Sequence, residues 1–73
     1  MRINIESTEQ VVQLNGVPAR MWEGKTDTGI DVYCFVTRIA VAKDQDTTQF
    51  ERELQKHKAP SIEIEAYPLR MVL

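Results

Sequence analysis

The sequence contains few of the residues that crosslink small proteins or carry out chemistry. Its 73 residues include one cysteine, one histidine, one tryptophan, three glycines and three prolines. A single cysteine excludes an internal disulfide bond and is typical of a reducing compartment. There is also no set of cysteines and histidines for a zinc ion. Small domains often depend on a disulfide, a metal ion or a partner subunit for stability. Of these three, the composition favours a partner subunit.

Neither sign of charge dominates, and no apolar run is long. The formal net charge is −2, with 9 basic and 11 acidic residues interspersed along the chain. Proteins that bind DNA usually have a basic face, so this balance argues against a nucleic-acid partner. No run approaches the roughly 18 apolar residues of a membrane span, and the first residues lack the apolar core of a signal peptide. We therefore expect a cytoplasmic protein without membrane contact.

What is present is the composition of an ordinary folded domain, 42% hydrophobic and 27% charged. A chain of this length allows a single domain, residues 1–73, with a thin core. The segment Ile30–Ala42 is rich in β-branched and aromatic residues, and its apolar side chains fall on both alternate faces. Such a pattern predicts a strand that is covered on both sides and lies in the centre of a sheet.

Turn signals divide the N-terminal half of the chain into hairpins. Asn15-Gly16 is typical of a type I′ turn, in which both central residues need positive φ, and residues 26–29 predict a second turn. Alternation predicts strands over residues 2–6 and 17–25. Apolar residues move from odd to even positions across residues 7–9. This change predicts a turn or a one-residue bulge that reverses the alternation.

The C-terminal half predicts one helix and a further strand. We expect the helix over residues 47–58, with Asp46 or Thr47 capping its free N–H groups and Pro60 ending it. The period-two pattern returns from residue 61 to the end of the chain. Together the segments predict an α+β fold, a small antiparallel sheet of four to five strands in the order β-β-β-β-α-β, with the helix packed on one face.

The two hairpin registers sort the strand side chains into two layers. One layer is large and apolar, and it is the expected seat for Phe50 and Leu54 of the helix. The strand residues of this first layer are Val12, Leu14, Ala19, Met21, Tyr33, Phe35 and Ile39.

The second layer is the candidate contact surface. One short helix that covers the first layer cannot also cover the second. An exposed apolar layer of this composition usually marks a contact surface. We predict that it binds a protein partner or a second copy of the chain, which would make a homo-oligomer. The alternatives are that the tail or the N-terminus covers Trp22, or that the layer forms a small-ligand pocket. The candidate contact residues are Arg20, Trp22, Val32, Cys34, Val36 and Arg38.

An alternative function is a nucleic-acid-binding accessory module. Arginine and aromatic side chains on neighbouring strands can clamp and stack a single strand of nucleic acid. The residues involved would be Arg20, Trp22, Arg38 and Tyr33. The acidic balance of the chain argues against this function. Tyr33, the other aromatic residue nearby, is expected to project to the opposite face from Trp22.

The sequence does not predict an arrangement of catalytic groups. His57 stands at the expected helix end and Cys34 in the middle of a strand, so a nucleophile with an adjacent base is not indicated. Glu63 and Glu65 share a strand face, but exposed glutamates on an edge strand commonly protect against aggregation. We therefore expect no enzymatic activity, no catalytic residue, no metal ion and no cofactor.

The chain resembles small uncharacterised proteins encoded by bacterial phages and prophages. The likeness is carried by the stretch N-G-V-P-A-R-M-W-E-G-K-T-D-T-G-I-D-V-Y-C-F-V-T-R-I-A-V, followed by F-E-R-E-L and A-P-S. It extends over most of the chain but includes no functional motif, so it implies no site residues. What it implies is an accessory protein of a mobile element that binds a host or phage component.

Overall fold

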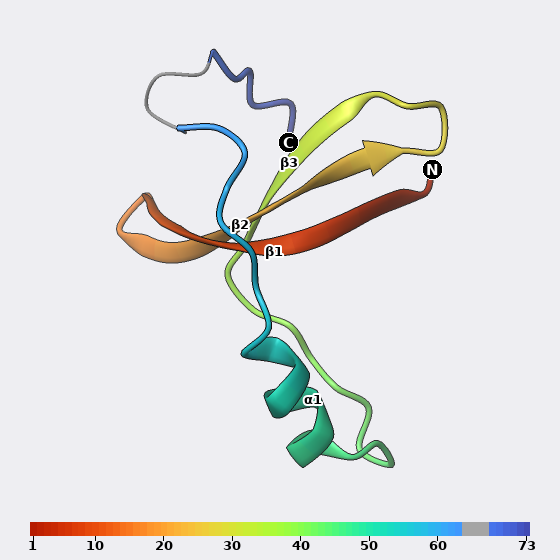
Figure 1. Ribbon diagram of the computed structural model, residues 1–73. Coiled ribbons are helices and arrows are strands. Elements are labelled where there is room, and N and C mark those ends of the chain that lie inside the picture. Colours follow the sequence, from red (N-terminus) through yellow and green to blue (C-terminus); the bar gives the residue numbers. More distant parts are fainter. Residues whose placement is uncertain (64–67) are drawn as a thin grey trace.

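The computed structural model describes residues 1–63 and 68–73, and it has an α+β fold (Figure 1). An antiparallel sheet in the order β1-β2-β3 is followed by one helix. The predicted class is therefore confirmed, whereas the described residues form three strands and not the predicted four to five. The predicted tail strand falls partly on residues 64–67, which lie outside the described residues. The elements are β1 (Ile3–Leu14), β2 (Val17–Thr26), β3 (Asp31–Val36) and α1 (Thr47–Leu54).

Strand β1 continues through residues 7–9, where the apolar pattern predicts a turn or a bulge. Its register with β2 changes between Ser7, which pairs with Trp22, and Val11, which pairs with Arg20. The predicted irregularity is thus present, but it contains two extra residues and not one. Because two extra residues leave the alternation unchanged, the early and late apolar residues of β1 lie on opposite faces. The predicted reversal, which would have put them on one face, is wrong.

Both predicted turns are confirmed by the backbone. Asn15 and Gly16 have φ values of 51° and 81°, as a type I′ turn requires, and Gly29 has a φ of 90°. The turns connect neighbouring strands, so β2 lies in the centre of the described sheet and β3 follows it. Within the described residues β3 is thus an edge strand and not the predicted central one over Ile30–Ala42, and it ends earlier, at Val36.

The two faces of the sheet are covered to different degrees. On β2 the residues Ala19, Met21 and Glu23 are buried, with exposed fractions of 1%, 0% and 6%. The residues that alternate with them, including Arg20 and Trp22, are only half-buried. We call these two surfaces the Met21 face and the Trp22 face. By the strand registers, the Trp22 face holds Ile3, Ile5, Ser7, Val11, Arg20, Trp22, Gly24, Val32, Cys34 and Val36.

Helix α1 stands away from the sheet (Figure 1). None of its Cα atoms lies within 8 Å of a strand Cα, and none of its residues is buried. Its apolar side chains Phe50 and Leu54 line a cavity together with Trp22. The helix therefore lies on the side of the Trp22 face. The prediction that it packs on the Met21 face is wrong.

The segment after the helix explains this arrangement. Lys58 forms a parallel bridge with Thr8 at the outer edge of β1, where its N–H donates to the Ser7 carbonyl at 3.1 Å. Ser61 then donates to Glu23, which lies on the Met21 face. The chain thus passes the edge of the sheet, and its tail, in place of the helix, reaches the Met21 face. Lys58 pairs with the edge of β1, and the helix ends at Leu54 and not at the predicted residue 58.

Candidate interaction surface

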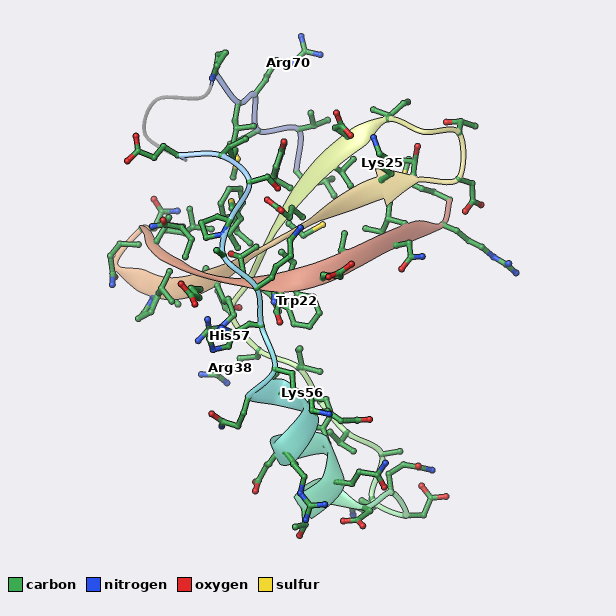
Figure 2. The ribbon with its side chains drawn as sticks, in the orientation of Figure 1. Trp22, Lys25, Arg38, Lys56, His57 and Arg70 are labelled. Carbon is green, nitrogen blue, oxygen red and sulfur yellow. The ribbon has the colours of Figure 1, made fainter. Side chains whose placement is uncertain are left out.

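Trp22 is at the centre of the uncovered face. It belongs to the middle strand, and its indole projects toward the side on which α1 lies (Figure 2). A cavity of about 490 Å³ opens between the indole, the helix and the segment that leaves the helix. Phe50 and Leu54 contribute apolar side chains, while Glu53, Lys56 and other charged residues stand at its edge. The cavity can therefore accept an apolar side chain of a partner, whose neighbouring polar groups would meet the charged residues of the cavity.

Strand β3 extends this surface beside Trp22. In the register, Cys34 lies opposite Trp22, and Val36 lies opposite Arg20. Val32, opposite Gly24, completes the row, and all three β3 residues are half-buried. Five of the six candidate contact residues are thus brought together on one face. The sixth, Arg38, is exposed and follows the end of β3, on the side of the sheet where the helix lies (Figure 2).

The irregularity in β1 holds Arg20 in place. The Nη1 atom of Arg20 donates to the carbonyl oxygen of Thr8 at 2.7 Å. Thr8 itself is fully buried, and its hydroxyl donates to the Met21 carbonyl at 2.7 Å and accepts from the N–H of Gln10 at 3.2 Å. These bonds satisfy backbone groups that a regular ladder would have paired. The sequence does not mark Thr8 as functional by a motif, and its signal is the change in apolar positions near residues 7–9.

A buried carboxylate lies under the opposite face. Glu23 accepts from Lys58 Nζ at 2.6 Å and from the N–H of Ser61 at 3.2 Å, and it also bonds the Ser61 hydroxyl. Burial by itself would raise the pKa of Glu23, but the hydrogen bonds from Lys58 and Ser61 outweigh it and hold the pKa below its ordinary value. The same pair raises the pKa of Lys58. This cluster ties the tail to the sheet and leaves the Trp22 face uncovered.

The role of Glu23 was also not predicted. Its signal in the sequence is an acidic residue two positions after Met21, on the same face of an otherwise apolar strand layer. Such a residue requires partners when it is buried. Its partners come from residues more than 30 positions away in the sequence, which no local pattern identifies.

The groups that could carry chemistry come from different segments of the chain. Cys34 is a free, half-buried thiol on β3, whereas His57 lines the cavity beside the helix end. Of the two predicted neighbouring carboxylates, Glu63 is exposed and Glu65 lies outside the described residues. Among the residues that the structure describes, no group of three or more His, Cys, Asp or Glu side chains could hold a metal ion.

Two further findings concern the whole chain. Within residues 1–63 and 68–73, no helix has the length and apolar character needed to cross a membrane. No protein-family model matches the chain, and no curated protein or solved structure is similar to it.

Proposed function

We propose that this chain is a non-enzymatic interaction protein that binds a protein partner, or another copy of itself, through the Trp22 face. The contact residues are the predicted set of Arg20, Trp22, Val32, Cys34, Val36 and Arg38. As part of the same proposal, the protein acts in the cytoplasm as an accessory component of a phage or prophage. Its mechanism is steric, because it covers a surface of its partner and performs no chemistry on it.

The difference in burial between the two faces supports this proposal best. Along the middle strand, Met21 has an exposed fraction of 0%, whereas its neighbour Trp22 remains half-buried. A central strand normally has both faces packed when both carry apolar residues. Here the tail reaches one face, and the helix leaves an open cavity over the other. An apolar face in this state marks a contact surface.

The residues on the face also suit a contact. A tryptophan beside arginines is the combination most enriched where interfaces gain most of their binding free energy. Arg20 is held by its hydrogen bond to Thr8, so little side-chain entropy is lost when a partner binds it. Arg38 is exposed at the margin and suits electrostatic steering of an acidic surface.

The first experiment replaces Trp22 with alanine and compares it with Phe35→Ala. Both residues are half-buried aromatics on adjacent strands, but Phe35 pairs with Met21 on the opposite face. We expect Trp22→Ala to weaken association by at least tenfold, about 1.4 kcal/mol or more, and Phe35→Ala to retain it. Light scattering measures self-association, and pull-down against candidate partners measures capture.

Circular dichroism and thermal unfolding of both variants establish that they are folded. A folded Trp22→Ala protein with unchanged mass and unchanged capture would contradict the proposal. So would equal losses in the two variants, because the effect would then not belong to one face.

The nucleic-acid alternative has less support. Tyr33 pairs with Glu23 and so lies on the face opposite Trp22, which removes one of the aromatic residues available for base stacking. The net charge of −2 also disfavours phosphate binding. Filter binding of single-stranded DNA and RNA at low salt separates the two functions, and retention that depends on Trp22 would favour the alternative.

A further inference from the structure

We propose that the partner on the Trp22 face is a second copy of this chain, so that two copies bury the apolar side of α1 and the cavity beside it between them. This inference rests on the proposed function and specifies the partner. It requires an isologous interface, in which the same surface of each copy contacts the other about a two-fold axis.

The chain exposes more surface than a compact monomer of its size. The chain exposes 6295 Å², whereas a compact monomer of its mass is expected to expose about 4,600 Å². The radius of gyration is 13.4 Å, compared with about 11 Å for a compact domain of this length. A stable interface of standard size removes roughly 800 Å² from each partner. The excess of about 1,700 Å² per copy is spread over the whole chain, and about half of it on the Trp22 face and α1 would be enough for a stable dimer.

Part of the exposed apolar surface lies on the Trp22 face and on α1. On the Trp22 face, Ile3 and Val11 have exposed fractions of 42% and 46%, and Leu54 of the helix has 38%. Leu54 lines the cavity with the half-buried Trp22 and Phe50, and Ile3 and Val11 lie further along the same face on β1. Burying them between copies would extend the hydrophobic core, which in one copy includes few fully buried side chains among the described residues.

The charges around the Trp22 face also suit contact with a second copy. A surface that contacts itself about a two-fold axis must present both signs. Here the sheet side carries Arg20 and Arg38, while α1 carries Glu51 and Glu53 with Arg52 between them. A two-fold arrangement that places the helix of one copy against the sheet of the other brings opposite charges together twice. A uniformly acidic or basic partner would match only one of the two regions.

The intact protein allows a test without substitution, because Trp22 is the single tryptophan. Sedimentation equilibrium over a wide concentration range should show the mass rising from 8.4 kDa to twice that value. Trp22 fluorescence, recorded over the same range, should shift to shorter wavelength in step with the mass, because the indole loses its remaining solvent exposure.

A pair of helix variants then locates the contact. Phe50→Glu should weaken self-association by at least tenfold, whereas Thr48→Glu, which makes the same change of charge on the far side of α1, should leave it unchanged. Since no Cα of α1 approaches a strand, we expect both variants to keep the sheet, and circular dichroism checks this.

Each result has a distinct meaning. A mass that doubles together with the fluorescence shift and depends on Phe50 supports the inference. A monomer at all concentrations overturns it, and the proposed function then stands if capture of another protein still depends on Trp22. A dimer with unchanged fluorescence, or one insensitive to Phe50→Glu, also overturns it, because the copies then meet elsewhere. If Trp22→Ala also leaves all capture intact, the proposed function fails with it.

Discussion

At the scale of single residues, Glu23 and Trp22 show how two neighbours on one strand acquire opposite roles. Glu23 faces the tail, where Lys58 and Ser61 compensate for the loss of water around its carboxylate. Trp22 faces the cavity, where nothing in the described chain completes its cover. Alternation along β2 separates them, because successive side chains of a strand point to opposite faces.

We predict that Glu23→Gln destabilises the protein by about 1–2 kcal/mol, since a buried group then loses its charge-assisted hydrogen bonds. The matched control is Asp31→Asn, which removes a carboxylate from the exposed ion pair with Lys25 and should change stability little, because exposed pairs contribute little. Urea unfolding measures both. Equal midpoints for the two variants would show that the Glu23 cluster does not hold the tail.

At the scale of elements, α1 shows how much a short helix depends on its cap. It has eight residues, fewer than an isolated helix needs to be stable in water. Asp46 accepts hydrogen bonds from the N–H groups of Thr48 and Gln49 at 2.9 and 3.1 Å. Because packing against the sheet contributes little, this cap carries an unusual share of the helix stability.

We therefore expect Asp46→Ala to lower helicity at 222 nm while leaving the unfolding temperature of the sheet almost unchanged. Loss of a cap of this type costs about 0.5–2 kcal/mol of helix stability. Asp44→Ala, two residues earlier and exposed, serves as the control and should preserve the helical signal. A parallel fall in helicity and in the sheet transition would instead mean that α1 and the sheet unfold as one unit.

Strand β1 contributes apolar residues to both faces of the sheet. The two extra residues in β1 keep the alternation while letting Lys58 bond the edge of the strand. The apolar positions of β1 consequently serve both faces, with Ile3 and Ile5 on the Trp22 face and Val12 and Leu14 on the Met21 face.

At the scale of the whole molecule, the contact between the tail and the sheet through Glu23 contributes a stability that depends on pH. The pKa of Glu23 lies below its ordinary value of 4.5, and that of Lys58 lies above its ordinary value of 10.5. For Glu23, the unfolded chain binds the proton more readily than the folded one, so its contribution to stability is present above pH 4.5 and is lost as the pH falls further. For Lys58, the contribution is present below pH 10.5 and is lost as the pH rises beyond it.

We predict that the free energy of unfolding falls in acid below about pH 4.5, and that Glu23→Gln removes part of this fall. The difference between wild type and variant should be largest near neutral pH and should shrink toward low pH, where the wild-type carboxyl is protonated. Urea midpoints measured across this range check the prediction. A difference that persists in strong acid would assign the effect of the variant to its shape and not to its charge.

The sequence by itself determined the features that depend on a few neighbouring residues. Asn15-Gly16 and Gly29 specify their turns through positive φ, Asp46 specifies the start of the helix, and the two turns set the registers that group Trp22 with Cys34 and Val36. Only the tertiary structure decided which segment covers which face. That choice depends on distant partners, the pairing of Lys58 with the edge of β1 and the bonds of Ser61 to Glu23. The stabilisation from these long-range contacts is comparable to the small gain from packing the narrow apolar stripe of the helix on the sheet. No local pattern therefore reveals which segment covers which face.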